Sequence, residues 1–340
     1  MKAPERVVIF HPAAIGDSML ATPVARTLRK NFPDTKITYW SHGSLEKILL
    51  DFCPAVDNFE TYQKDAGLIS HIKHLTSLAP DLFVDLSNST RGRILGLFAT
   101  IKGARVCSYR KQKTSPEKTI HAVDNFIESI KDITVDRPDN YFPSIFPDSK
   151  TLAAVEEKIG STAGSTILGI VPGVGMLRPH RGWSLENWLS VLNHFESQKN
   201  MQCILIGGPE EASAGEYLEQ KLDTDSRESN KVKNLCGRLD LKETAAALKL
   251  CKVVVSCDTG PAHIACAVGT PVIGLYGPTL LERSGPYGND HLALTATDSC
   301  RCLAEKCCRF KKPTEPGRCM DQILPLSVIE RIESILNQAT

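Results

Sequence analysis

The chain has 340 residues, more than one ordinary hydrophobic core requires, which suits two domains of conventional size. Apolar residues make up 42% of the sequence and charged residues 23%, the composition of a soluble globular protein. The net charge of +1 excludes a global field that would attract nucleic acid or a membrane surface, so any functional charge must be local.

The N-terminus and the apolar segments predict a cytoplasmic protein without a transmembrane segment. The first ten residues lack the basic start and long apolar run of a signal peptide. The longest apolar patches, such as the one around 94–101, are far shorter than the ~20 residues of a membrane span. Peripheral association with the inner face of the inner membrane stays compatible with this prediction.

In the first half, short runs of Val, Ile and Leu alternate with amphipathic stretches of helix length, which predicts parallel α/β architecture. A strand at Val7–Phe10 is followed by the loop His11–Ile15 and by a helix from about Gly16 to Asn31. We expect further strands at Lys36–Trp40 and Leu82–Leu86. The segment Asp136–Pro147 carries three prolines and no clear periodicity, so it predicts a domain boundary near its end.

The second half repeats this layout. We expect one domain over 1–148, a second over 149–325 that begins with a helix at about 149–160, and a final helix in 326–340. Strands of the second domain are predicted at Ile167–Val171, Cys203–Ile206, Val253–Ser256 and Val272–Tyr276. The final helix has capping-box spacing from Ser327 to Glu330, and we expect its apolar stripe to pack back across the domain junction.

Ligands of doubly wound sheets bind at the carboxyl ends of the strands, so we expect functional residues in the loops after the strands. The first loop places Asp17 beside a glycine at the head of a helix. It lacks both the glycine fingerprint of dinucleotide binding and the ending of a P-loop. From the residues alone, Asp17 is either a helix-start acid that complements the macrodipole or a general base.

The loop that follows Val253–Ser256 carries the more specific pattern, from Asp258 to His263. Pro261 suits a first helical turn, and Gly260 lets a ligand approach the backbone closely. Free N–H groups at this helix start would form an anion site, and the alternative is that Asp258 merely caps the helix. His263 alone is more often a packed histidine than a ligand.

Two further loops add weaker signals. The Gly/Pro-rich loop 172–184 holds Arg181, and arginine is well matched to phosphate oxygens, although a solvated surface loop is the alternative. In the loop Gly207–Glu211, a carboxylate would accept ribose hydroxyls, or it would only open the next helix.

Together, three motifs resemble glycosyltransferase family 9, the heptosyltransferases. They are Ile15–Pro23, Ser256–His263, and Gly274–Thr279 followed by Gly285–Gly288, and they occur in the family's order and spacing. The resemblance implies a GT-B fold: two Rossmann-like domains face a cleft, the N-terminal one binds the acceptor and the C-terminal one binds the nucleotide sugar. It also implies transfer of heptose from ADP-heptose to the lipopolysaccharide inner core in one inverting displacement. No Asp-x-Asp metal motif stands at a suitable loop, so we expect no catalytic metal and no required cofactor.

The resemblance also assigns roles by position. Asp17 is the catalytic base, and Arg181, which stands where the family usually has lysine, contacts the diphosphate. The remaining donor-site residues are Glu210 at the ribose, Leu239 at the adenine, Thr259 and Gly260 at the phosphates, and Asp258 and His263 near the sugar.

An acceptor patch is expected in the stretch 91–118, which holds eight Lys and Arg residues against one acid. A solvated basic face is the ordinary interpretation of such a run. With the resemblance, we favour a patch for an anionic lipopolysaccharide-core acceptor at the membrane surface. Its members named for this role are Arg91, Arg93, Arg110 and Lys111.

Five cysteines crowd into 300–319, and their spacing is not the usual paired pattern of a zinc site. A structural metal site is kept as a minority hypothesis. Its ligands would be Cys300, Cys302, Cys307, Cys308 and Cys319.

Three rival functions are weighed against this interpretation. An NAD-linked oxidoreductase is disfavoured by the absent glycine fingerprint. A glycan- or nucleotide-binding module without turnover is disfavoured by the intact Asp17 and Arg181. A nearer alternative is a family-9 transferase that uses another nucleotide sugar or a protein acceptor.

Overall fold

The computed structural model describes most of the chain, in six stretches. They are residues 3–111, 119–135, 140–160, 164–222, 231–296 and 316–337. Contacts within the chain divide it into two compact units, Met1–Phe146 and Pro147–Thr340. Within the described residues, no helix combines the length and apolar character needed to cross a lipid bilayer.

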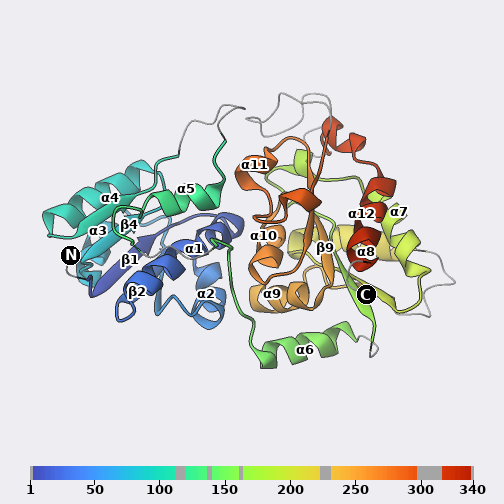
Figure 1. Ribbon diagram of the computed structural model, residues 1–340, viewed down its shortest axis with the longest axis horizontal. Helices are drawn as coiled ribbons and strands as arrows, with labels where there is room; N and C mark the ends of the chain where they lie inside the picture. The colour runs from blue at the N-terminus through green and yellow to red at the C-terminus, as the bar shows by residue number, and fades with distance from the viewer. Residues whose placement is uncertain are drawn as a thin grey trace. The chain divides into compact units, whose positions relative to one another are not determined.

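The first unit is a five-stranded parallel sheet in the order β3-β2-β1-β4-β5. Its strands are β1 Arg6–Phe10, β2 Lys36–Ser41, β3 Asn58–Thr61, β4 Leu82–Asp85 and β5 Arg105–Ser108. Its helices are α1 Ile15–Asn31, α2 Glu46–Phe52, α3 Leu68–Leu78, α4 Thr90–Ile101 and α5 Ala122–Glu128, with a 3-10 turn η1 at Gly43–Leu45. Helices α3 and α4 cover one face of the sheet and α1 and α2 the other, as right-handed crossovers require (Figure 1).

The second unit is a six-stranded parallel sheet in the order β11-β10-β9-β6-β7-β8. Its strands are β6 Thr166–Val171, β7 Met201–Leu205, β8 Val232–Asn234, β9 Val253–Cys257, β10 Val272–Tyr276 and β11 Leu294–Thr295. Its α-helices are α6 Ser149–Ile159, α7 Leu185–Glu196, α8 Ala212–Lys221, α9 Leu241–Leu250, α10 Gly260–Ala267, α11 Leu281–Ser284 and α12 Pro325–Asn337. Its 3-10 helices are η2 Pro179–Arg181, η3 Pro209–Glu211, η5 Asp290–Leu292 and η6 Arg318–Gln322.

The expected parallel α/β class is confirmed in both units, and each sheet reverses its strand order once. The reversal lies between β1 and β4 in the first sheet and between β6 and β9 in the second. At such a point the loops after the two strands diverge and leave room for a ligand. Asp17 follows β1, Arg181 follows β6 and Asp258 follows β9, so the fold directs all three toward these edges.

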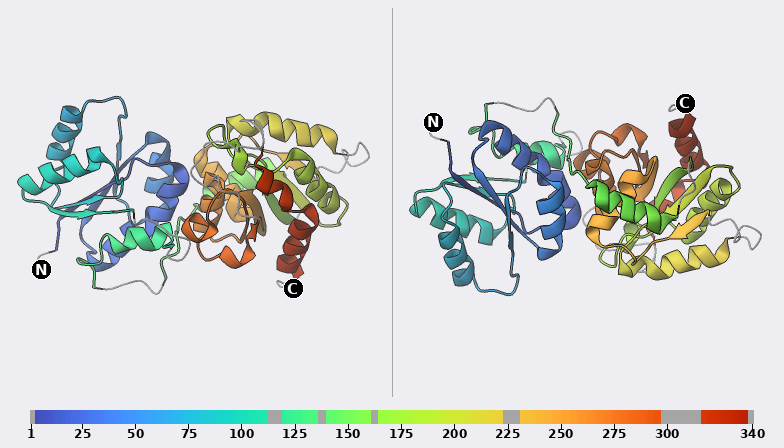
Figure 2. Two further views of the ribbon diagram at one scale, coloured as in Figure 1. Left: turned by 90° about the horizontal axis from the view of Figure 1, so that it is seen from above. Right: turned by 90° about the horizontal axis from the view of Figure 1, so that it is seen from below.

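The C-terminal helix differs from its expected place. The apolar side chains Val328, Ile329 and Ile332 of α12 are buried in the core of the second unit, where the helix packs against α7 and β10. In Figure 2, α12 is the red helix that ends near the C-terminus. The stripe, expected at the domain junction, is thus buried in the core of its own unit, against α7 and β10.

Helix α1, which carries Asp17 in its first turn, contains a proline that interrupts its backbone hydrogen bonds. Pro23 has no N–H to donate to the carbonyl of Met19, one helical turn earlier. The hydroxyl of the preceding Thr22 donates to that same carbonyl over 2.7 Å. The Thr-Pro pair thus repairs its own break, and α1 continues to Asn31.

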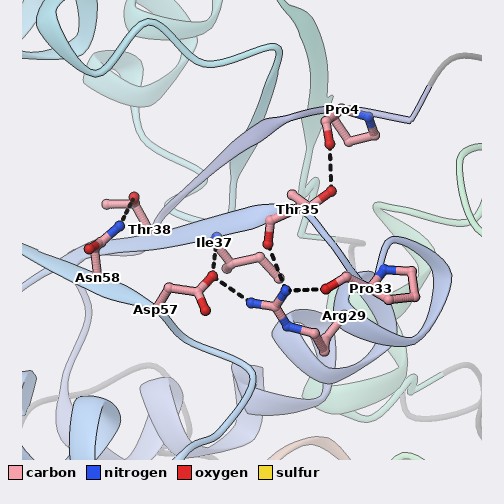
Figure 3. Close-up of polar contacts among 8 residues, drawn as sticks. All are labelled: Pro4, Arg29, Pro33, Thr35, Ile37, Thr38, Asp57 and Asn58. Atoms are coloured by element: carbon pink, nitrogen blue, oxygen red, sulfur yellow. Dashed lines mark hydrogen bonds and ion pairs between the residues drawn. The ribbon is translucent and has the colours of Figure 1, made fainter.

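The other end of α1 is fastened to the amino edge of the first sheet by Arg29 (Figure 3). Its guanidinium donates to the carbonyls of Pro33 and Thr35 and to the carboxylate of Asp57. That carboxylate also accepts the N–H of Ile37 in β2. A helix held at its end in this way keeps its first turn, with Asp17, at a fixed place on the carboxyl edge.

Candidate functional site

The strand reversal of the second sheet brings together two charged side chains far apart in the sequence. Arg181 Nη1 lies 2.8 Å from Asp258 Oδ2, and only 7% of the Asp258 side chain is exposed. The loops after β6 and β9 lie side by side because these strands are hydrogen-bonded neighbours, so the pairing is a direct result of topology. Two of the candidate loops of the second half therefore contribute to one cluster.

His263 completes this cluster from the first turns of α10. Its Nε2 lies 3.8 Å from Asp258 Oδ1, and both side chains are buried. Burial by itself raises the pKa of the Asp258 carboxyl, but His263, Arg181 and Thr279 outweigh it and hold the pKa below its ordinary value. Asp258 is therefore ionised at neutral pH, and the cation of Arg181 is held against a fixed anion.

Asp258 does not cap α10. The N-cap residue is Thr259, whose side chain makes no capping hydrogen bond and instead lies 2.9 Å from the hydroxyl of Ser256. Pro261 occupies the first turn, as expected from the sequence. The N–H groups at the start of α10 are left without a side-chain cap. Together with Arg181 they form a region of positive potential suited to an oxyanion.

The loop after β7 assigns its two glutamates different places. Glu210 is exposed, whereas Glu211 accepts the N–H of Gly208 and the N–H of Gly175, each over 2.8 Å. Glu211 thereby ties the loop after β7 to the loop after β6. Sequence reasoning missed it, although Gly208 and Glu211 stand at capping-box spacing, the signal that would have found it.

Two more residues lie on the same carboxyl edge. Leu239 is half-buried in the turn after β8, where it was expected to face an adenine. Thr279 follows β10 and is one of the groups that lower the pKa of Asp258. The sequence motif Gly274–Thr279 contained this threonine, but without a role, because nothing local reveals that the loops after β9 and β10 meet.

The corresponding point of the first sheet has a different chemistry. Asp17 is exposed in the first turn of α1. Behind it, His11 is buried, with Nδ1 3.0 Å from the hydroxyl of Tyr39. Burial lowers the pKa of His11 to about 4, against a smaller opposing effect of Asp17, so this histidine is neutral at physiological pH. The arrangement leaves a solvent-facing carboxylate near a buried, neutral histidine.

The predicted basic patch is only partly assembled. Arg91 is half-buried and donates to the hydroxyl of Tyr62 and to the carbonyl of Lys64, so its cation is committed within the unit. Arg93, Arg110 and Lys111 are exposed. Lys113, Glu117 and Lys118 lie outside the described residues.

Four of the five clustered cysteines, Cys300, Cys302, Cys307 and Cys308, also lie outside the described residues. Cys319 is described and is buried. Among the residues that the structure places, no three His, Cys, Asp or Glu side chains come together as a metal-ligand set.

A cavity of about 760 Å³ lies at the amino edge of the first sheet, with Glu5, Asp81 and Arg105 in its lining. These residues stand at the starts of β1, β4 and β5, the edge opposite to Asp17. Doubly wound sheets bind their ligands at the carboxyl edge, so we place the candidate site at the strand reversals and not in this cavity.

The match to a known protein family covers the same region of the chain. The sequence model of glycosyltransferase family 9 (heptosyltransferase) matches residues 90–313, a range that includes Arg181 and Asp258. Lipooligosaccharide heptosyltransferase 2 of Campylobacter jejuni is 24% identical over 339 residues, covering 98% of this chain and 99% of that protein. The lipopolysaccharide core heptosyltransferase OpsX of Haemophilus influenzae is 25% identical over 303 residues, covering 85% and 83%.

The fold is shared with a solved structure. The ADP-heptose lipopolysaccharide heptosyltransferase II of Escherichia coli superposes with a TM-score of 0.78 at 20% identity, over 98% of this chain and 99% of that one. Such a likeness identifies two doubly wound sheets of the GT-B type. Since the family model matches well over half of the sequence, the chain belongs to glycosyltransferase family 9, the heptosyltransferases.

Proposed function

We propose that this glycosyltransferase moves heptose from ADP-heptose to the inner core of lipopolysaccharide in one inverting displacement. The observation that carries the proposal is the ion pair of Arg181 and Asp258 beside the uncapped start of α10. This arrangement suits a diphosphate, because a guanidinium carries five N–H donors in a fork and need not release Asp258 to meet a second oxyanion. We take the donor, ADP-heptose, and the acceptor, the lipopolysaccharide core, from the names of the related proteins.

In the proposed reaction, the Asp17 carboxylate accepts the proton of an acceptor hydroxyl. The hydroxyl oxygen attacks the anomeric carbon, and the bond from that carbon to the diphosphate oxygen breaks. The bonding electrons leave with ADP, whose growing negative charge is stabilised by Arg181 and by the N–H groups of α10. One such preorganised donor is worth about 3 kcal/mol in comparable sites. The proposal requires no metal or other cofactor.

The remaining roles are proposals of the same kind. Glu210 would accept ribose hydroxyls, and Leu239 would pack against adenine. Asp258 would keep Arg181 in place and, with His263, contact the sugar. Arg93, Arg110 and Lys111 would bind an anionic acceptor at the inner face of the membrane. Arg91 would shape the acceptor site through Tyr62, because its guanidinium is already held there.

The test measures ADP release and product formation with ADP-heptose and deacylated lipopolysaccharide core. Parallel reactions offer UDP- and GDP-sugars, and a further one offers protein acceptors. Turnover that is confined to ADP-heptose and the core supports the proposal. Turnover with another donor or with a protein acceptor would instead favour the alternative transferase, and ADP binding without any turnover would indicate a non-catalytic module.

A further inference from the structure

A segment near the C-terminus of the second unit supports the loop that carries Arg181. We call residues 316–323, which include η6, the Gly317 segment. The N–H of Gly317 donates to the carbonyl of His180 over 3.0 Å. From the other side of the loop, Trp183 Nε1 donates to the carbonyl of Ile323, also over 3.0 Å. These two bonds bracket Arg181, one residue before it and two residues after it.

Gly317 is a glycine because of space and not because of backbone conformation. Its φ of −70° and ψ of 147° are open to any residue. A Cβ atom at this position, however, would lie 2.6 Å from the carbonyl oxygen of His180. That oxygen belongs to the backbone of η2 and already accepts the N–H of Gly317, so it cannot turn aside without moving the loop. The contact therefore allows a hydrogen and no carbon.

The Gly317 segment is itself anchored, so it can serve as a support. Cys319, Met320 and Ile323 are buried in the core of the second unit. The sulfurs of Cys319 and Met320 press on Gly277, directly after β10, where a Cβ would lie 2.8 and 2.6 Å from them. The segment is thus wedged between the end of β10 and η2, and its position is fixed from both sides.

We propose that the Gly317 segment holds η2 in the position at which Arg181 meets Asp258, and that Gly317 is a positioning residue for the diphosphate-binding arginine. This inference rests on the proposed function, since it assumes that Arg181 binds the diphosphate of the donor. It assigns the segment a task in donor binding rather than in the chemical step, because its two hydrogen bonds go to the backbone of His180 and to the side chain of Trp183, on either side of Arg181.

The experiment measures ADP affinity by titration calorimetry and KM for both substrates. Gly317→Ala displaces η2, so we expect ADP to bind about tenfold more weakly, the effect of one lost charged hydrogen bond. KM for ADP-heptose rises by a similar factor, while KM for the acceptor is unchanged. A general structural defect would not separate the two substrates in this way.

The matched control is Gly67→Ala, because no atom lies within 4 Å of the added carbon and the backbone there needs no glycine. We expect it to keep wild-type ADP affinity. If Gly317→Ala does not fold, as judged by its thermal unfolding, Trp183→Phe tests the same support. It removes the hydrogen bond to Ile323 and puts a smaller ring in the indole's place against Trp188, and the lost bond should weaken ADP binding about threefold.

Double mutants with Arg181→Gln decide whether the effect passes through Arg181. In that background, Gly317→Ala or Trp183→Phe should cause no further loss of ADP affinity. An equal loss in both backgrounds, or full ADP affinity in folded Gly317→Ala, would overturn the positioning role while leaving the donor site intact. If the wild-type chain bound no ADP, the proposed donor site would fail first, and the positioning role would fall with it.

Discussion

The two sheets share the strand order 3-2-1-4-5, yet their reversal points carry opposite chemistry. The second sheet brings together a buried carboxylate, a buried imidazole and a half-buried guanidinium, and His263 and Arg181 hold the pKa of the carboxyl below its ordinary value. The first sheet exposes its carboxylate, Asp17, and backs it with a histidine that burial keeps neutral. One edge is a cluster of charged groups, and the other carries an exposed carboxylate that we propose as the base.

The difference fits the two tasks that we propose for these edges. Binding an anion demands charges whose orientation is settled in advance, and such charges are strongest where water is excluded. Accepting a proton demands a carboxylate that stays ionised and within reach of a hydroxyl. A second ion pair beside Asp17 would stabilise its anion and make it a weaker base. In the proposed mechanism, burial and partners rather than strand topology fit the same fold to both tasks.

The largest expected effect would come from removing the base. Asp17→Asn keeps the size of the side chain but cannot accept the proton, so we expect kcat to fall about a thousandfold. ADP affinity should stay at the wild-type value, because the donor cluster belongs to the other unit. Steady-state kinetics with ADP-heptose and acceptor, with calorimetry of ADP binding, would measure both. Near-normal turnover would refute the assignment of Asp17.

The buried cluster should respond in stability as well as in binding. Asp258→Asn removes the anion and leaves Arg181 and His263 without it, which should cost about 3 kcal/mol of unfolding free energy. Because the native pKa of Asp258 is lowered, its contribution is present above its ordinary value near 3.8 and is lost as the pH falls below it. Chemical denaturation of both proteins at pH 7 and pH 3.5 would show the difference shrinking in acid. An unchanged difference would contradict the charged cluster.

On the first sheet, the buried histidine predicts a pH dependence in a higher window. The native pKa of His11 is about 4, whereas an unfolded chain takes up this proton near 6.5. The native state binds fewer protons between these values, so stability falls as the pH is lowered through this window, by about 3 kcal/mol at most. His11→Asn should flatten the dependence between pH 7 and pH 4.5 in denaturant titrations. A dependence that persists unchanged in the variant would contradict it.

The smallest expected effect separates two neighbouring glutamates. Glu211→Gln replaces one carboxylate oxygen by an NH2 group, so one of the N–H groups of Gly175 and Gly208 loses its acceptor, which should cost about 1 kcal/mol of stability. Glu210→Gln changes an exposed side chain, so its stability should stay within about 0.5 kcal/mol. We expect Glu210→Gln to weaken ADP binding several-fold instead. If the two variants behaved alike, the division of labour in this loop would be wrong.

Much of the fold could be predicted from the sequence, because parallel strands that are buried on both faces are apolar throughout. The strand expected at Val272–Tyr276 was found at those residues, and the first helix was found one residue earlier than expected. The edge strands β3 and β5 were not predicted, because strands of four residues with polar and exposed positions carry too little pattern. The C-terminal helix was recognised, but its packing partners were not.

The candidate site, too, could be predicted only in part from the sequence. The sequence determined which loops hold Asp17, Arg181 and Asp258, because each motif is local and follows a strand. Only the tertiary structure decided that Arg181 pairs with Asp258, that Glu211 and not Glu210 ties two loops together, and that Gly317 lies under His180. These contacts join residues between 36 and more than 130 positions apart. Periodicity and local motifs report on neighbours along the chain, whereas strand order sets which loops meet.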